Sequence, residues 1–445
     1  MFILRPLFTP FYSAFSNTSL GQERAHWFIQ TLLAVIVPCT SSMTSNLLRT
    51  LHTLFGLDAT QRRFYIFMAS PKLPWQRLWV ILWAMIPAPL TDGRLVLVLD
   101  DFINPKTGKK IFGCATFFDH AAKANQSQYP WAQNVVCLGL LKQIKGRWAC
   151  LPLASRYYLP QKAIDQKTIN TTKNKQTVPF ETKLTQSVAM LVDVAKSFTN
   201  VTILVVCDSW FGNRGLLGPA RKKIGATFHI LSRLRSNSAI RAQPEPRTKS
   251  QRGRPAKYGQ RLGSASELAT CHRKDAQEYS VQAYGQRRTI LAFSSLAMLP
   301  SLQCLVRIVW VYRRSQWVAL FTTDLTLTLV EIVQLYAARW KIEASFKELK
   351  QEIGSRFSQT RNAHAVTNHL NFCMMAMSLT WIHADKMSEL PQRRHSVVGR
   401  DSFAFSDVRR STAEAILSED FARVFPVSHN PVRKWITSVL LGLAA

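Results

Sequence analysis

Two short apolar runs, each ending in aspartate, constrain this chain more than any other feature of its sequence. The run LVLVLDD ends in Asp100 and Asp101, and the run VTILVVCD ends in Asp208. Uncharged runs of this length are typical of strands that are buried on both faces of a sheet. Carboxylates that project from separate rigid strand ends are able to converge on divalent metal ions. A single aspartate at a strand end is common, so it is the recurrence in two runs that indicates a metal site.

The order of the predicted elements indicates an α/β protein with a helical start. Residues 1–90 have helical spacing of apolar side chains, and short apolar runs begin near residue 95. We predict a first strand at 95–101, an antiparallel second strand in KKIFGCATFFDH, a third strand at 135–141 and a helix at 185–198. Strands in VTILVVCD and ATFHILSRL follow. Three hairpin-like strands, a helix and two further strands are the order expected of an RNase H-like sheet.

A third carboxylate lies on a predicted helix in LYAARWKIEASFKELKQEIG. At about 100° per residue its polar side chains fall on one stripe roughly 60° wide; they are Tyr336, Arg339, Glu343 and Lys350. The apolar side chains form a separate packing face. Such a helix suits the edge of a site. The alternative is a solvated face on which arginine and glutamate pair at i, i+4 spacing.

The four polar residues of this stripe also match a family motif. Their spacing, Y-x2-R-x3-E-x6-K, is the Y-R-E-K motif of a large branch of bacterial insertion-sequence transposases of the DDE type, which cut and paste DNA. The segment VVCDSWFGNRGL resembles the second-aspartate segment of that branch, which makes Asp208 the second catalytic acid. The resemblance extends over roughly residues 40–385.

The first-aspartate segment departs from the family pattern at one position. LVLDDFINPKTGKKIFG is similar to that segment, but Phe102 stands where the family has threonine. The departure leaves open whether Asp100 or Asp101 is the first metal ligand, and analogy with D-G-T favours Asp100. Both residues are therefore candidate catalytic acids.

The resemblance implies a complete set of roles. Asp100, Asp208 and Glu343 would bind two Mg²⁺ ions, for which Mn²⁺ would substitute, and the enzyme would cut transposon ends and join them to target DNA. Arg339 and Lys350 would hold phosphates near the scissile bond, and the Tyr336 hydroxyl would fix another. The implied partners are terminal inverted repeats, target DNA and a second copy of the chain on DNA. The implied location is the nucleoid in a bacterial cytoplasm.

The charge of the chain agrees with a polyanionic partner. Lysine and arginine number 57 against 26 acidic residues, which gives a formal net charge of +31. Such a protein is drawn to DNA, although charge alone would also fit RNA or an anionic membrane surface. Residues 233–261 predict a mobile basic loop with nine Lys or Arg side chains and one acid, Glu245. In it, Arg252, Arg254 and Lys257 are candidate DNA-backbone contacts; the alternative is a solvated linker.

The interval between Asp208 and Glu343 is long, and its short apolar runs predict a β-rich insertion. Family members that form hairpin ends stack a flipped base on a tryptophan in this neighbourhood, and Trp317 is the closest match in position. A tryptophan inside an apolar strand is more often core, and Trp310 is a competitor for the same role. Trp317 is therefore a candidate DNA contact, and the alternative is that it is a core residue.

The remaining features define boundaries and exclude other classes. No apolar stretch reaches the roughly 20 residues of a spanning helix, and no signal peptide is expected. The eight cysteines form no C-x-x-C pair, so we expect free buried thiols and no structural zinc site. The alternatives to an active transposase are an inactive, transposase-derived DNA-binding protein and another RNase H-like nuclease. We predict a helical N-terminal region, the first part of the core, the basic loop with the β-rich insertion, the second part of the core and a basic tail, at residues 1–90, 91–232, 233–323, 324–385 and 386–445.

Overall fold

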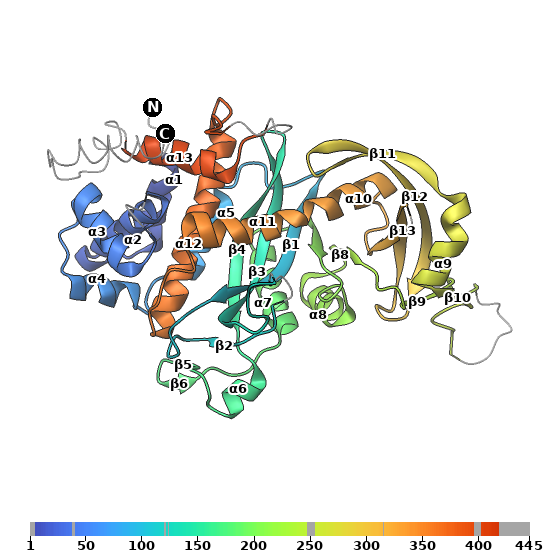
Figure 1. The fold of residues 1–445 in the computed structure, drawn as a ribbon, viewed down its shortest axis with the longest axis horizontal. Coiled ribbons are helices and arrows are strands. Elements are labelled where there is room, and N and C mark those ends of the chain that lie inside the picture. Colours follow the sequence, from blue (N-terminus) through green and yellow to red (C-terminus); the bar gives the residue numbers. More distant parts are fainter. Residues whose placement is uncertain are drawn as a thin grey trace.

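The protein is a mixed α/β molecule built on one large sheet. Its computed structural model describes residues 5–37, 41–119, 122, 124–246, 254–314, 316–395 and 402–417. Figure 1 shows the N-terminal helices at one end, the sheet through the middle and a β-rich part at the other end. The predicted α/β class is confirmed.

The large sheet has twelve strands in the order β10-β9-β12-β13-β14-β8-β7-β1-β3-β2, with β4 beside β3 and β11 beside β12. The central strands are β1 (Arg94–Pro105), β3 (Trp131–Ile144), β4 (Arg147–Tyr158), β7 (Thr202–Cys207) and β8 (Phe228–Arg233), and β2 (Cys114–Thr116) lies on the edge. β1 is antiparallel to β3 and parallel to β7, which is parallel to β8. Leu95 to Leu99 are at most 1% exposed, as expected of a strand covered on both faces.

The first part of the sheet differs from the sequence prediction in three ways. β1 continues past the two aspartates to Pro105. The predicted second strand in KKIFGCATFFDH shortens to β2, and it pairs with β3 and not with β1. The chain turns at Gly113, whose φ is +73°, after Ile111 and Phe112 have entered a separate small core. β4 was not predicted, although its hairpin with β3 turns at Lys145–Gly146, where both φ values are positive, as a two-residue type I′ turn requires.

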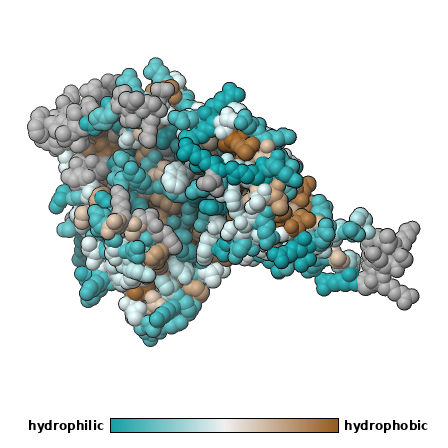
Figure 2. All heavy atoms as spheres, turned by 45° about the vertical axis from the view of Figure 1, so that its right-hand side comes forward, coloured by the Kyte–Doolittle hydropathy of each residue, from teal (hydrophilic) through white to brown (hydrophobic). Residues whose placement is uncertain are grey.

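The β-rich part continues the same sheet. Its strands are β9 (Ala239–Arg241), β10 (Arg261–Ser264), β11 (Gln277–Ala283), β12 (Gln286–Leu299), β13 (Cys304–Arg313) and β14 (Gln316–Thr322). β14 pairs antiparallel with β8 and so joins the two parts. The helix α9 (Ala265–Cys271) and the 3-10 turn η2 (His272–Asp275) belong to this part. In the space-filling view of Figure 2 the surface shown is mostly hydrophilic, with separate hydrophobic patches.

The basic loop predicted at 233–261 is anchored at both ends. β9 and β10 pair with each other, and Ala242 N donates to Gln260 O at 2.9 Å. The reading of this whole segment as an irregular loop was therefore wrong at its ends, because backbone pairing overrides the lack of apolar periodicity. Residues 247–253, which include Arg252, lie outside the described part of the chain.

Helices cover the central strands. The helix α7 (Lys183–Ala195) packs on β3, β4 and α8 (Arg214–Ile224), and α11 (Trp340–Glu348) lies across β4 and β1 (Figure 1). The remaining elements of this region are α6 (Gln161–Asp165), the small hairpin β5 (Thr172–Lys173) and β6 (Gln176–Thr177), and α10 (Leu329–Ala338). Within the described ranges no helix is both long and apolar enough to cross a membrane.

The N-terminal helices are fastened to the core through one long helix, α12 (Ala363–Lys386). They are α1 (Arg5–Phe8), the 3-10 turn η1 (Thr9–Ala14), α2 (Ser19–Ile36), α3 (Thr44–Phe55), α4 (Gln61–Met68) and α5 (Trp75–Ala84), and α13 (Phe405–Leu417) packs nearby. Asn368 is 2% exposed; its amide donates to Met68 O and Ser70 O and accepts from Trp75 Nε1. Asn371, one turn later, accepts from Trp79 Nε1 across this interface.

Asn368→Ala should lower the free energy of unfolding by about 2–4 kcal/mol, because it leaves two buried carbonyl groups and one partly buried indole N–H without their partner. Asn371→Ala is the matched variant on the same helix and should cost clearly less. Urea denaturation of both variants measures the difference. Equal losses in the two variants would contradict the role given to Asn368.

Candidate active site

Asp100 and Asp208 lie side by side where β7 ends and β1 continues. Leu99 of β1 is in register with Cys207, the last residue of β7. Asp100 and Asp208 directly follow this pair and therefore lie beside each other. Side chains at the same level of neighbouring parallel strands leave on the same face. Asp208 is held in place by its own loop, because its Oδ1 accepts from the backbone N–H groups of Trp210 and Phe211 at 3.0 Å each.

Arg339 joins Asp100 to the predicted third acid. Its Nη1 donates to Asp100 Oδ2 at 3.0 Å and its Nη2 donates to Glu343 Oε1 at 2.7 Å. The Arg339 side chain is only 13% exposed, and its guanidinium lies over the ring of Tyr336 at 5.8 Å. Charge-assisted bonds that are shielded from water in this way are stronger than surface pairs.

Asp100 is in an unusual electrostatic position. Burial raises the pKa of its carboxyl to about 7, Arg339 opposes the rise, and the charge of Asp208 adds to it. Burial and a neighbouring carboxylate both disfavour ionisation. A positive charge placed near Asp100 and Asp208 would therefore stabilise their ionised forms.

Asp101 faces away from this cluster. Successive side chains of a strand point to opposite faces, and Asp101 Oδ2 accepts from Lys183 Nζ and from Asn134 Nδ2, each at 2.8 Å. Lys183 is the first residue of α7, on the other side of β1 from α11. Of the two candidate first acids, the structure brings Asp100 to Arg339 and Glu343.

The helix that carries Glu343 is not one regular helix. α10 ends at Ala338, α11 begins at Trp340, and a π-helical turn, η3 (Leu349–Ile353), follows. The single helix predicted over this stretch was wrong in that respect: the Arg339 N–H bonds to Tyr336 O, three residues back and not four. Arg339 and Glu343 still lie on the same face, because their side chains are hydrogen-bonded to each other.

Lys350 lies farther along the same edge. Its Nζ donates to Ile103 O at 3.4 Å and lies 5.8 Å from the centre of the Phe102 ring. Burial lowers the pKa of Lys350, which Asp119 partly opposes. Phe102 packs against Phe346 of α11 with ring centroids 4.5 Å apart. The phenylalanine at this departure from the family pattern therefore helps to fasten the Glu343 helix to β1.

A divalent cation suits the donors of this site. Carboxylate oxygens are the ligands that Mg²⁺ prefers, and within the described residues Asp208 Oδ2 and Glu343 Oε2 have no hydrogen-bonding partner. No group of three Asp, Glu, His or Cys residues in the described ranges is already arranged to hold a metal. The Arg339 guanidinium lies between Asp100 and Glu343 and supplies positive charge there.

A comparison with protein families now bears on this arrangement. A model described as DDE superfamily endonuclease matches residues 10–290, which is more than half of the chain. The chain belongs to the DDE superfamily endonucleases. The match covers Asp100, Asp101 and Asp208 and ends before Glu343, so the geometry alone links α11 to the two aspartates. A comparison with curated proteins finds no match.

Membership in this endonuclease family has plain consequences. Its members are nucleases that act on DNA and generally use divalent metal ions. The carboxylate cluster around Arg339 has the donor set that such chemistry needs.

Other predicted contacts of the endonuclease lie away from this cluster. Arg254 and Lys257 are exposed in the stretch before β10. Trp317 is half-buried on β14 opposite Tyr312 of β13. Trp310 is fully buried and donates to Ala265 O at 3.1 Å, so this competitor is a core residue.

Sequence reasoning missed two lysines of the endonuclease. Lys183 pairs with Asp101, and the buried Lys106 donates to the carbonyl oxygens of Ser355, Arg356 and Ser358. Burial lowers the pKa of Lys106 to about 8. Lys106 thus ties the end of β1 to the loop after the π-turn. The position of Lys106 in K-T-G-K, shortly after the two aspartates, was the sequence feature that could have marked it as part of the site region.

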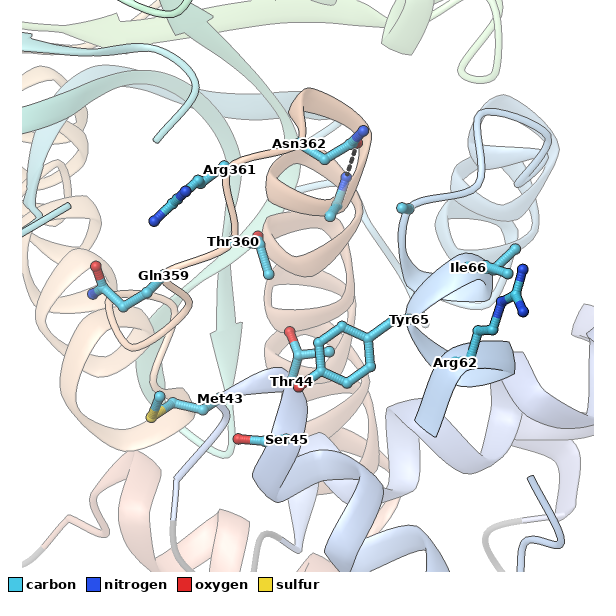
Figure 3. Close-up of a pocket in the computed structure, with 12 residues that line it drawn as sticks. Met43, Thr44, Ser45, Arg62, Tyr65, Ile66, Gln359, Thr360, Arg361 and Asn362 are labelled. Carbon is cyan, nitrogen blue, oxygen red and sulfur yellow. Dashed lines mark hydrogen bonds between the residues drawn. The ribbon is translucent and has the colours of Figure 1, made fainter. Parts of the chain in front are cut away.

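The endonuclease also has a pocket of about 670 Å³ between its N-terminal helices and the start of α12. Figure 3 shows Arg361 and Asn362 from the loop before α12 together with Tyr65 and Arg62 of α4 around it. None of the three predicted metal ligands lines this pocket. Asn362 is already engaged as the cap of α12, since its Oδ1 accepts from the His364 and Ala365 N–H groups.

Asp100→Asn should stabilise the metal-free endonuclease at high pH. The folded-state pKa of Asp100 is raised, so its contribution to stability is present below the unfolded-state pKa and is lost as the pH rises to about 7. The variant should therefore melt at a higher temperature than wild type at pH 8 and gain nothing at pH 4. Asp193→Asn, whose original side chain is 41% exposed, is the control. A melting difference independent of pH would contradict this account.

Proposed function

We propose that this chain is a DDE transposase of the Y-R-E-K branch, which cleaves DNA at transposon ends and transfers the freed strands into target DNA. The observation that carries the proposal is the Arg339 bridge between Asp100 and Glu343, with Asp208 alongside. The bridge joins Asp100, which lies in the region matched by the family model, to Glu343 on α11, which lies outside it. Both residues are acids that the sequence predicted for the site.

The sheet supports an RNase H-like core. β1, β3 and β4 are neighbouring antiparallel strands of the sheet, α7 comes later in the chain, and β7 and β8 then add parallel to β1 on its other side. Three antiparallel strands, a helix and two further strands are again the pattern expected of such a core, with β4, and not the predicted KKIFGCATFFDH strand, as one of the three. The β-rich part between β8 and α10 is then the insertion, so the proposed division at residues 91–232, 233–323 and 324–385 follows the chain.

The proposed roles begin with the three acids. Asp100, Asp208 and Glu343 would hold two Mg²⁺ or Mn²⁺ ions, which supply an activated hydroxyl nucleophile and stabilise the leaving oxygen. Arg339 would release its carboxylates and hold a phosphate of the scissile strand, because guanidinium pairs with either anion. Lys350 would hold a second phosphate. The Tyr336 hydroxyl would position a third, although burial keeps its pKa raised.

The proposed partners are transposon ends, target DNA and a second copy of the chain. The net charge of +31 supports the first two, because each phosphate contact releases counterions. The exposed Arg254 and Lys257, with Arg252 beyond the described part, would contact the backbone. Trp317 stays a proposed base contact whose half-buried position also fits packing. A nucleoid location in a bacterial cytoplasm follows from the same function.

Asp208→Asn should abolish strand cleavage in Mg²⁺ and leave DNA binding within about threefold of wild type, because it removes a metal ligand and no phosphate contact. Nicking of a labelled duplex that carries the element's ends, together with detection of 3′-OH termini, measures the effect. An inactive DNA-binding descendant would show no nicking in the wild type. Another RNase H-like nuclease would nick without joining the ends to a second DNA.

Asp100→Asn and Asp101→Asn form a matched pair on adjacent residues. The first should remove cleavage as Asp208→Asn does. The second should retain cleavage, at a reduced rate, because Asp101 pairs with Lys183 on the other face of β1. The nicking assay decides, and a fully active Asp100→Asn variant would refute the assignment of Asp100 as the first ligand.

Neutralising Arg254, Lys257 and Arg261 together should weaken DNA binding and flatten its salt dependence. The log–log slope against salt should fall by about 0.9 for each lost phosphate contact. Titration of DNA over a series of salt concentrations measures the slope. An unchanged slope would show that this segment is a linker.

A further inference from the structure

A cluster of partly exposed aromatic side chains lies beside Asp101 and Asp208. We call it the aromatic shelf: Trp210, Tyr158, Phe180 and Phe117, with Lys183 among them. Lys183 Nζ lies 5.6 Å from the Trp210 ring centre and 5.2 Å from that of Tyr158. Phe180 and Phe117 each lie 6.4 Å from Tyr158. The shelf members come from four separate segments of the chain, since Phe180 lies shortly before Lys183, the first residue of α7.

Trp210 is mounted rigidly and remains open to solvent. Its backbone N–H donates to Asp208 Oδ1, and its carbonyl accepts from Asn213 Nδ2 at 2.6 Å. Its ring packs against the fully buried Phe211 with centroids 4.8 Å apart. The Trp210 residue is nevertheless 45% exposed, and Phe180 is 36% exposed. Almost half of Trp210 thus stays open to solvent, close in the chain to a carboxylate of the candidate site.

The chemistry of the shelf fits unpaired nucleobases. Proteins that bind single strands combine aromatic platforms, which accept any base by stacking, with cations that hold the backbone. Lys183 supplies the cation, held in place by Asp101 Oδ2 at 2.8 Å. An acidic partner protein would use the lysine and leave the aromatic rings unused. The net charge of +31 also disfavours a second copy of this chain as the occupant.

We propose that the aromatic shelf is a binding site for unpaired nucleobases of the DNA strand next to the scissile phosphate, with Trp210 as the main stacking platform. The site rests on the proposed function for its substrate, and it adds a strand-separating step that the carboxylates do not provide. Bases stacked on Trp210 offset the cost of unpairing the DNA at the cleavage point.

The test compares two DNA probes without divalent metal, so that no strand is cut. One is a blunt duplex and the other is the same duplex with a few mismatched, unpaired bases at one end. Wild type should bind the frayed probe more tightly. Trp210→Ala should weaken binding of the frayed probe by roughly 5- to 150-fold for each base that stacks, and change binding of the blunt probe less than about twofold. Trp210→Phe should keep most of the preference.

Tyr284→Ala is the matched control, because Tyr284 is a 63% exposed aromatic residue on the β11–β12 turn, away from the shelf. It should bind both probes as wild type does. Equal weakening of both probes by Trp210→Ala, or no preference in wild type, would overturn the proposal. A change of oligomeric state in Trp210→Ala with unchanged DNA binding would also overturn it, since the shelf would then be a protein contact.

The two proposals fail differently. A wild-type protein that prefers the frayed probe through Trp210 and yet never nicks DNA in Mg²⁺ keeps the shelf and loses the transposase assignment. A protein that nicks DNA through Asp208 and shows no preference keeps the transposase assignment and loses the shelf.

Discussion

The candidate site depends on the contact of Arg339 with two carboxylates that lie far apart in the sequence. Asp100 and Glu343 come from β1 and α11, and each would face the other's negative charge without the guanidinium between them. Asp208 adds a third negative charge at the same edge and raises the pKa of Asp100 further. A concentration of carboxylates in a partly buried place is costly unless cations compensate it. Arg339 supplies that positive charge between Asp100 and Glu343.

Packing holds this electrostatic arrangement in place. The Phe102–Phe346 contact fastens α11 to β1, and Lys106 fastens the loop after the π-turn to the end of the same strand. β7 ends at Cys207, directly before Asp208, while β1 continues to Pro105. The site lies at the carboxyl ends of the parallel strands β1 and β7, where open α/β sheets bind their ligands. Rigid strands thus position two of the acids, and the broken helix brings the third.

The sequence predicted the α/β class, both apolar strands that carry the aspartates and the polar stripe around Glu343. It left Asp100 and Asp101 open because adjacent strand residues differ only in the face they point to, and the face depends on partners such as Lys183 and Arg339. It missed β4 because the strand carries polar side chains near its end and its two-residue turn is marked only by Lys145–Gly146. It missed the aromatic shelf because Trp210, Tyr158 and Phe180 converge only through the tertiary fold.

The most direct test of the central claim locates the metal itself. Fe²⁺ in place of Mg²⁺, with ascorbate and peroxide, generates hydroxyl radicals that cut the polypeptide close to the bound ion. Mass spectrometry of the fragments from the DNA-bound protein should show cuts next to Asp100, Asp208 and Glu343, all suppressed by excess Mg²⁺. Cuts at other positions, or at Asp100 and Asp208 without Glu343, would contradict a site assembled from β1, β7 and α11.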